Sequence, residues 1–378
     1  MPSIARAETV GSLLRPAYLY EAREKARSGE GSADELRAVE DRAILEAIDL
    51  QKSVGLDVIT DGEYRRVGWN PATSYQPGAP IEGYGPAEDY RITYMKFWRD
   101  NSGKLVQRNL GPGTVVKTPL NLRSDIAGKE YGFLQQHAGF RTKYTFTAPS
   151  YHRHFWHPKY SSDAYPTVDA YLAAVRDLIR REIVDRVIAL GGDYIQLDAP
   201  NYGQAYTDPD VRAAFEAEGH DLEAELIADA ELDNSLFDGI TGVTRAIHVC
   251  RGNGGGGYWS ASGGYEHFAA EMFPRLTNID NLLLEYDTDR AGGFEPLEHV
   301  RPGATVVLGL LTTKNGTLED RATVEARIKE ASGYLPLENL ALSTQCGFAS
   351  SGPGNPLSFD EQRAKLELIS SVARDVWN

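Results

Sequence analysis

Two cysteines, a histidine and a glutamate form a candidate set of metal ligands at the ends of predicted strands. His248 and Cys250 are two residues apart on one predicted strand, so their side chains project to the same face. Glu285 and Cys346 stand near the ends of two other predicted strands. Thiolates together with an imidazole select zinc among the common divalent ions, and a carboxylate can complete a tetrahedron. These four residues are therefore our candidate Zn²⁺ site, provided that the fold brings the strand ends together.

The alternative interpretation is a buried histidine beside two inert thiols, and the spacing of His248 and Cys250 alone leaves it open. Two observations favour a metal. The chain has only two cysteines, which excludes a disulfide framework, and both fall at strand ends. Catalytic groups of a barrel enzyme are found at these strand ends.

Eight short strand-like segments alternate with helical patterns, which predicts parallel βα units. The segments are Ala7–Ser12, Asp57–Glu63, Lys143–Ala148, Asp193–Asp198, Ala246–Arg251, Asn281–Asp287, Thr305–Thr312 and Leu340–Gly347. Capping boxes at Ser32 with Glu35 and at Ser358 with Glu361 mark two helix starts. We expect an α/β fold, a single (β/α)8 TIM barrel over residues 1–378, with a doubly wound parallel sheet as the alternative.

Residues 64–139 interrupt this rhythm and are expected to be an insertion after the second strand. Within it, Tyr90–Trp98 alternates like a strand, Asp100–Gly103 has turn composition, and Lys104–Gln107 is predicted to return as the partner strand. The segment from Tyr64 to Tyr131 contains six tyrosines and two tryptophans. Because such residues favour interfaces, a hairpin lid and a homo-oligomer contact are equal alternatives.

Composition excludes several classes of protein. The 54 acidic residues exceed the 39 basic ones, for a net charge of −15, which argues against nucleic acid and anionic membrane surfaces as partners. The start of the chain lacks a long apolar segment, and the strongest apolar run, Ala304–Leu311, is too short to span a membrane. We therefore expect a cytoplasmic protein with no membrane partner.

Seven motifs, in order along nearly the whole chain, closely resemble the cobalamin-independent methionine synthase family, specifically its short single-barrel members. They are VGSLLRP, GLDVITDGEYRR, YIQLDAPNY, HVCRGN, LLLEYDTDRAGGFEPL, VVLGLLTTKNGTLED and LALSTQCGFASS. The resemblance implies a barrel that binds zinc through His248, Cys250, Glu285 and Cys346, the same four residues chosen above.

The resemblance also implies a site for the amino acid homocysteine. The family holds this substrate by a Gly-Ser turn after the first strand, by a glutamate in a G-E pair and by an aspartate in a Q-x-D motif. The matching residues are Gly11, Ser12, Glu63 and Asp198, and we take Glu63 and Asp198 as the catalytic candidates as well. Asp61 and Asp287 are either partners of the zinc ligands or solvated rim carboxylates.

The implied activity is a zinc-dependent S-methyltransferase that joins a small-molecule thiol and an alkyl donor. A zinc-bound thiol loses its proton and becomes a nucleophile, so homocysteine would be converted into methionine. Four protein ligands already saturate a tetrahedron, and we expect the hard carboxylate of Glu285 to give way to the incoming thiol.

The chain departs from the family on the side of the methyl donor. Long members use a folate whose leaving nitrogen needs a proton. Leu311 stands where the family has its proton-donating histidine, TFTAPS replaces the folate-stacking tryptophan, and Gln204 stands near a folate-binding carboxylate. These losses argue against methyltetrahydrofolate. The replacement acid would come from YHRHFWHPKY, in which His152, His154 and His157 are the candidates.

Two other functions remain open from the sequence. An epoxyalkane:coenzyme M transferase of the same superfamily would open an epoxide with the zinc-bound thiolate and would need no leaving nitrogen. The retained Glu63 and Asp198, which suit an ammonium group, favour homocysteine over the sulfonate of coenzyme M. A non-catalytic zinc-binding barrel is the alternative from a different class.

Overall fold

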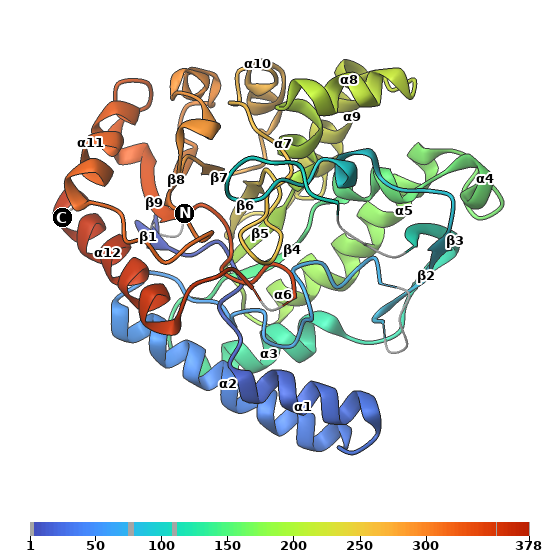
Figure 1. Cartoon of the computed structure of the whole chain (residues 1–378), viewed down its shortest axis with the longest axis horizontal. Helices are drawn as coiled ribbons and strands as arrows, with labels where there is room; N and C mark the ends of the chain where they lie inside the picture. The colour runs from blue at the N-terminus through green and yellow to red at the C-terminus, as the bar shows by residue number, and fades with distance from the viewer. Residues whose placement is uncertain (1–3, 75–78, 108–111, 353, 378) are drawn as a thin grey trace.

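A seven-stranded parallel sheet forms the centre of the computed structural model, which describes residues 4–74, 79–107, 112–352 and 354–377. The sheet curls, and helices surround it (Figure 1). From β4 onward, each strand pairs in parallel with the next one along the chain, as the predicted βα alternation requires. In spatial order the strands are β1 (Ala7–Glu8), β9 (Leu340–Thr344), β8 (Thr305–Leu311), β7 (Asn281–Glu285), β6 (Thr244–Val249), β5 (Tyr194–Asp198) and β4 (Tyr144–Thr147).

The helices begin where the sequence predicts. The hydroxyls of Ser32 and Ser358 each accept a hydrogen bond from the backbone N–H three residues later, and the carboxylates of Glu35 and Glu361 accept one from the serine N–H. Within the described ranges, no helix is both long and apolar enough to cross a membrane. The helices are α1 (Ala17–Ser28), α2 (Ala33–Val54), α3 (Ile126–Ala138), α4 (Pro158–Ser161), α5 (Val168–Ile179), α6 (Asp185–Ala189), α7 (Pro200–Tyr206), α8 (Pro209–Ala217), α9 (Leu222–Ser235), α10 (Ala269–Met272), α11 (Arg321–Ala331) and α12 (Phe359–Trp377).

Residues 57–59 fill the gap between the two edges of the sheet. The Asp57 N–H donates to the carbonyl of Ala7 in β1 at 2.9 Å. On the other side, the Ile59 N–H donates to Arg141, and the Ile59 carbonyl accepts from Lys143, which leads into β4. Hydrogen bonds therefore run around the whole ring, and the predicted barrel is confirmed.

The predicted strand Asp57–Glu63 is wrong beyond this short contact, because a side chain replaces the neighbouring strand. The amide of Gln51 in α2 donates to the Thr60 carbonyl at 2.7 Å and accepts from the Thr60 N–H at 3.0 Å. Gly62 and Glu63 then adopt φ angles of 67° and 59°, in the left-handed region, so the chain turns at the edge of the barrel.

The insertion contains an antiparallel hairpin outside the predicted one, and of the predicted hairpin only the end at the turn is present, where Arg99 pairs with Leu105. The hairpin is formed by β2 (Ile81–Ala87) and β3 (Gly113–Leu122), which lie to the side of the barrel, next to α4 and α5 (Figure 1). The predicted strand Tyr90–Trp98 is wrong, since it includes a 3₁₀ helix at Thr93–Lys96.

The reason for this error is the burial pattern, because Ile92, Thr93 and Tyr94 are buried in succession, which does not fit a one-sided strand. The predicted turn is present, with the Gly103 N–H donating to the Asp100 carbonyl at 2.9 Å. The lid and interface interpretations of residues 64–139 stay predictions.

Alternate residues of the strands fill the inside of the barrel. One buried cluster takes a residue from each of β5 to β9 and three from the segments next to β1 and at residue 58: Ala5, Val10, Val58, Tyr194, Ala246, Leu283, Val307 and Ala341. Because side chains on a strand alternate between faces, the face that carries Ala246 also carries His248 and Cys250. The same two-residue step leads from Tyr194 to Asp198 and from Leu283 to Glu285. The inner faces therefore carry the candidate residues toward the carboxyl end of the barrel.

Replacing Gln51 with Leu is expected to lower the free energy of unfolding by roughly 2–4 kcal/mol. The substitution leaves two buried backbone groups of Thr60 unsatisfied, and each such group costs about 1–3 kcal/mol. Urea denaturation followed by circular dichroism measures the change. Gln136→Leu, at an exposed position of α3, is the matched control with an expected effect below about 0.5 kcal/mol. Equal midpoints for the two variants would contradict the bracing role of Gln51.

Candidate metal centre

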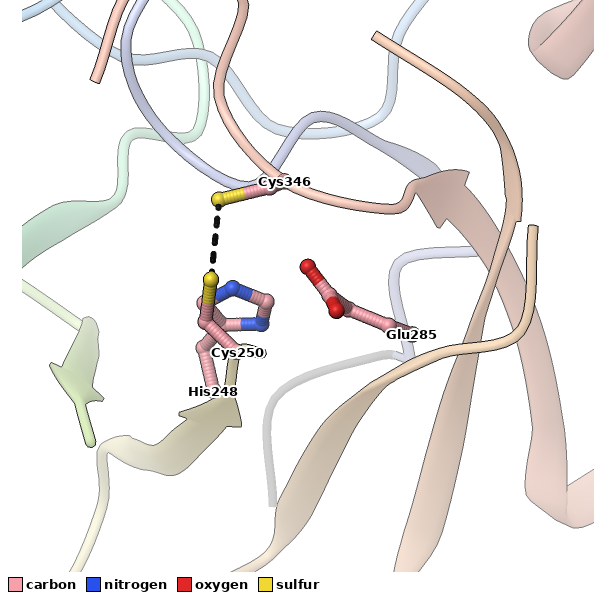
Figure 2. A group of neighbouring side chains, drawn as sticks. All are labelled: His248, Cys250, Glu285 and Cys346. Atoms are coloured by element: carbon pink, nitrogen blue, oxygen red, sulfur yellow. Dashed lines mark hydrogen bonds between the residues drawn. The ribbon is translucent and has the colours of Figure 1, made fainter. Parts of the chain in front are cut away.

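The four predicted ligands come together at the carboxyl end of the barrel. One ligand atom from each of His248, Cys250, Glu285 and Cys346 lies within 4.8 Å of the others, and all four residues are buried. Figure 2 shows the imidazole and the two sulfurs facing the carboxylate of Glu285 across a small space. Three strand ends, those of β6, β7 and β9, supply the set, so residues 98 positions apart in the chain become neighbours (346 − 248 = 98).

His248 presents one ring nitrogen to the cluster. Its Nδ1–H donates to the carbonyl of Leu283 in β7 at 3.1 Å, which fixes the ring and the tautomer. Its Nε2 has no hydrogen-bond partner among the described residues, although it is buried. Burial lowers the pKa of His248, but the neighbouring Cys346, Asp198 and Glu285 outweigh this effect and raise the pKa to about 9. A metal ion in the cluster would take the place of the proton on Nε2.

The two sulfurs lie close enough to share one ion. Cys250 Sγ and Cys346 Sγ are 3.6 Å apart, and two thiolates on one tetrahedral zinc lie about 3.8 Å apart. Their mutual hydrogen bond lowers the pKa of Cys346 well below its ordinary value and raises that of Cys250 well above it. Without a cation, the pair thus holds one proton between two sulfurs.

Glu285 is held in place by its neighbours. Gln345 Nε2 donates to Oε1 at 2.8 Å, and the Arg251 N–H donates to Oε2 at 3.0 Å. Burial alone would raise the pKa of Glu285, but the charges of Arg290, Lys314 and Arg251 outweigh it and lower the pKa. The carboxylate is therefore ionised, which suits a metal ligand.

A cavity of about 200 Å³ opens beside the cluster and contains all four predicted substrate residues. Its lining includes Gly11, Ser12, Glu63 and Asp198, together with His248, Cys250 and Cys346. The structure thus brings the predicted substrate residues and three of the predicted metal ligands to one space, while their roles in binding remain predictions.

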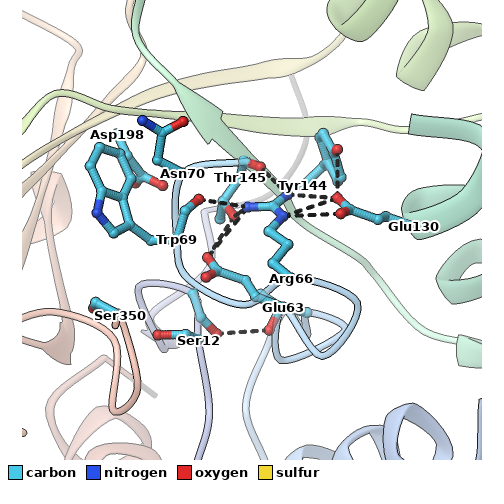
Figure 3. Close-up of polar contacts among 12 residues, drawn as sticks. Ser12, Glu63, Arg66, Trp69, Asn70, Glu130, Tyr144, Thr145, Asp198 and Ser350 are labelled. Atoms are coloured by element: carbon cyan, nitrogen blue, oxygen red, sulfur yellow. Dashed lines mark hydrogen bonds and ion pairs between the residues drawn. The ribbon is translucent and has the colours of Figure 1, made fainter. Parts of the chain in front are cut away.

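Glu63 is fixed at one oxygen and leaves the other without a partner. Its Oε1 accepts from Thr145 Oγ1 at 3.0 Å and lies 3.7 Å from the guanidinium of Arg66 (Figure 3). Its Oε2 is buried without a hydrogen bond among the described residues. Burial raises the pKa of Glu63 to about 7. A side chain at Gly11 would collide with this carboxylate, since a Cβ there would lie 2.6 Å from Oε1.

Asp198 and Ser12 complete this side of the cavity. Gln196 Nε2 donates to Asp198 Oδ1 at 2.7 Å, and burial raises the pKa of Asp198 to about 6. The Ser12 carbonyl accepts from the Phe348 N–H at 2.8 Å, which ties the loop after β1 to the loop after β9. The loop that carries Cys346 and the loop that carries Ser12 are thus held together.

Comparison with known proteins identifies the family. No family model matches the chain. The uncharacterized protein YxjH of Bacillus subtilis is 36% identical over 375 residues, which cover 98% of this chain and 94% of YxjH. A Listeria monocytogenes structure, provisionally assigned as a vitamin-B12-independent methionine synthase, superimposes with a TM-score of 0.73 at 28% identity, over 100% of both chains.

The chain belongs to the cobalamin-independent methionine synthase family. A B12-independent methionine synthase from Shewanella sp. W3-18-1, solved in complex with selenomethionine, shares the fold with a TM-score of 0.72 at 20% identity. That alignment covers 99% of this chain and 98% of the Shewanella chain. Methionine-synthase-like methyltransferases are therefore the structural neighbours of this family member.

The residues expected to replace the acid of the family do not reach the cavity. His152 Nδ1 meets the hydroxyl of Tyr84 at 2.7 Å, and Nε2 meets Thr147 Oγ1 at 3.1 Å. Burial lowers the pKa of both His152 and His154 to about 3, so both rings are neutral. His154 and His157 line a different groove. Among the described residues of the cavity lining, none of these three histidines is present.

Other sequence candidates also occupy different places. Asp61 accepts from the Glu63 N–H at 2.8 Å and so stabilises the turn, and Asp287 lies 3.6 Å from Arg290. Neither is the partner of a ligand described above, and that role falls to the Leu283 carbonyl, Gln345 and Arg251. Gln204 does line the cavity, where its Nε2 donates to Ser260.

The sequence did not single out the aromatic side of the cavity. Trp69, Tyr94, Met95 and Trp98 of the insertion and Tyr151 of the 3₁₀ helix Pro149–Phe155 contribute to its lining. The signal was present as the aromatic content of residues 64–131. Nothing in the local pattern, however, distinguishes a ring facing a cavity from one at an interface.

Replacing Cys250 with Ser or His248 with Gln is expected to reduce the bound metal from one ion per chain to almost none. Each change removes one of four ligands, and the remaining three bind far more weakly. Elemental analysis by mass spectrometry measures the stoichiometry, and circular dichroism checks that the fold is retained. His267→Gln, on a histidine outside the cluster, is the matched control and should keep the metal. Full metal content in Cys250→Ser would contradict the assignment.

Proposed function

We propose that this protein is a zinc-dependent S-methyltransferase that binds homocysteine, ionises its thiol and methylates the sulfur to give methionine. One observation carries the proposal: a single cavity is lined by two cysteines and a histidine and also by the carboxyl groups of Glu63 and Asp198. A thiol that also bears an ammonium group matches both kinds of lining residue.

Zinc is the metal that this donor set fits best. Two sulfurs at 3.6 Å, an imidazole nitrogen without a partner and an ionised carboxylate are soft and borderline ligands in the number that zinc prefers. A bound zinc ion would lower the pKa of a coordinating substrate thiol, so that the thiol ionises near neutral pH. This chemistry supplies the nucleophile for methyl transfer.

The protein groups around the cavity bind and orient the amino acid. Glu63 Oε2, which is unpartnered, and the carboxylate of Asp198 would accept hydrogen bonds from the ammonium group. The Gly11–Ser12 turn provides space beside Glu63, since a larger residue at position 11 would displace the carboxylate. Together these groups would hold the substrate so that its sulfur lies next to Cys250 and Cys346.

The coenzyme M alternative has less support from the same cavity. A sulfonate calls for lysine or arginine, and none of the described residues lining the cavity is either one. Two of them carry carboxyl groups instead. The non-catalytic alternative does not account for a pocket of this composition next to the ligand cluster.

Incubation of the zinc-loaded protein with thiols and donors tests the proposal. Homocysteine, 4-mercaptobutyrate and coenzyme M are each combined with methylcobalamin, methyltetrahydrofolate, S-methylmethionine or epoxypropane, and mass spectrometry follows the products. The proposal predicts methionine as the main product. A hydroxypropyl thioether of coenzyme M would support the alternative transferase. Absence of methionine with every donor would overturn the proposal.

Replacing Glu63 with Gln is expected to raise KM for homocysteine by roughly 10- to 150-fold. A hydrogen bond to a charged group contributes about 1.5–3 kcal/mol, and the amide cannot attract the ammonium as the carboxylate does. Methyl transfer to 4-mercaptobutyrate, which lacks the amino group, should change little. Glu88→Gln, at an exposed position, is the matched control. An equal loss for both thiols would show that Glu63 does not bind the ammonium group.

The value of kcat/KM for homocysteine is expected to rise with pH between about 6 and 8. Burial raises the pKa of Glu63 to about 7, so the carboxyl is protonated below that pH and ionised above it, and only the ionised form attracts the ammonium. Initial rates across this range, with 4-mercaptobutyrate as the reference thiol, isolate the contribution of Glu63. An identical pH profile in Glu63→Gln would contradict this assignment.

A further inference from the structure

Four aromatic rings form one side of the cavity beside the predicted metal site. We call Trp69, Tyr94, Trp98 and Tyr151 the aromatic wall. The rings of Trp69 and Tyr151 pack edge to face with centroids 4.8 Å apart, and Tyr94, Trp98 and Tyr151 are buried. Figure 3 shows Trp69 on the same side of the site as Asp198 and Asn70. Such a set of rings beside the candidate metal site offers a binding surface for a second substrate.

The charged groups of the cavity favour a positively charged ligand beside the aromatic wall. Its described lining contains two carboxyl groups, Glu63 and Asp198, and no lysine or arginine. Lys314 is buried nearby but donates to Asn253 Oδ1 at 3.0 Å and is not part of the lining. Aromatic faces attract cations through their quadrupole, and aromatic cages bind methylated cations in this way. An anionic donor would find no counter-charge here.

The size of the cavity and the absence of the three candidate histidines from its described lining narrow the class of donor. The cavity volume of about 200 Å³ is below the roughly 300–1,000 Å³ of pockets for drug-sized ligands, which suits a small donor beside the amino acid. None of the three candidate histidines borders the cavity, and Leu311 is buried in β8. A donor whose leaving group needs no proton is compatible with this lining.

We propose that the methyl donor is a small sulfonium compound, held as a cation against the aromatic wall. This inference rests on the proposed function, since it names the second substrate of the same site. The aromatic rings would contact the methyl groups of the cation, while Glu63 and Asp198 hold the amino acid in the same cavity.

The transfer balances without any further reactant. The homocysteine thiol loses its proton to solvent, and the thiolate sulfur donates an electron pair to one methyl carbon of the sulfonium. The new S–CH₃ bond forms as the C–S⁺ bond breaks, and the electron pair of the broken bond stays on the departing sulfur. A neutral thioether leaves, and the sum releases one proton per methionine.

Deuterated trimethylsulfonium is the simplest probe, because it carries the charge and the methyl groups and nothing else. The zinc-loaded protein is incubated with homocysteine and this probe, or separately with labelled S-methylmethionine, S-adenosylmethionine, methyltetrahydrofolate or methylcobalamin. Mass spectrometry detects trideuterated methionine, and gas chromatography detects dimethyl sulfide from trimethylsulfonium. The inference predicts labelled methionine from the small sulfonium donors, one proton released per turnover, and competitive inhibition by tetramethylammonium.

Substitutions in the aromatic wall test the place of binding. Trp98→Leu is expected to raise KM for trimethylsulfonium about tenfold, the equivalent of about 1.4 kcal/mol from one cation–π contact, with KM for homocysteine unchanged. Trp98→Phe keeps an aromatic face and should retain most of the affinity. Trp377→Leu in α12, outside the cavity lining, is the control for loss of a tryptophan.

The outcomes separate this inference from the proposed function. Methionine formed from methyltetrahydrofolate, methylcobalamin or S-adenosylmethionine, but not from the small sulfonium donors, would overturn the inference and leave the proposed function standing. Absence of methionine with all donors would overturn both. Equal KM for trimethylsulfonium in Trp98→Leu and Trp377→Leu would also overturn it, because the cation would then lie elsewhere.

Discussion

Three ionisable acids with ligand atoms buried within 4.8 Å of one another repel each other when ionised, and a cation among them relieves this repulsion. Cys250, Glu285 and Cys346 are such a group, and His248 adds a nitrogen without a partner. A protein can relieve this repulsion by retaining protons or by binding an ion. The contact of 3.6 Å between the two sulfurs fits the first route, since it raises the pKa of Cys250 and lowers that of Cys346. The ligand types and their spacing fit the binding of a metal ion, and the proposed activation of the substrate thiol depends on that ion.

Residues both next to the ligand cluster and farther away hold the site in place. Parallel strands place His248, Glu285 and Cys346 at one end of the barrel, and Gln345 and the Leu283 carbonyl fix the orientation of the ligands. On the opposite side of the cavity, Gln51 ends the partial strand at Thr60, so that the left-handed turn brings Glu63 next to Gly11. A short and irregular strand is therefore the means by which a substrate-binding residue reaches the site.

The sequence predicts the regular parts of this structure well, because they follow from local periodicity. Alternation along β6 places His248 and Cys250 on one face without knowledge of the rest of the chain. The partial strand at residues 57–63 is not predictable in this way, since the Gln51 side chain that replaces its neighbour comes from α2. The prediction of a strand at Tyr90–Trp98 was wrong for a related reason. Tyr90–Trp98 has strand-like residues, but its burial depends on a cavity formed by distant segments. The aromatic wall is not predictable from the sequence, because aromatic residues have the same local pattern whether they face a ligand, a core or another subunit.

X-ray absorption spectroscopy of the zinc-loaded protein, with and without homocysteine, tests the central claim most directly. The free protein should show two sulfur ligands on the metal, from Cys250 and Cys346, with the remaining ligands being nitrogen and oxygen. Addition of homocysteine should raise the number of sulfur ligands to three. A metal environment that gains no sulfur when the thiol is added would contradict the account, even if the metal is present in full.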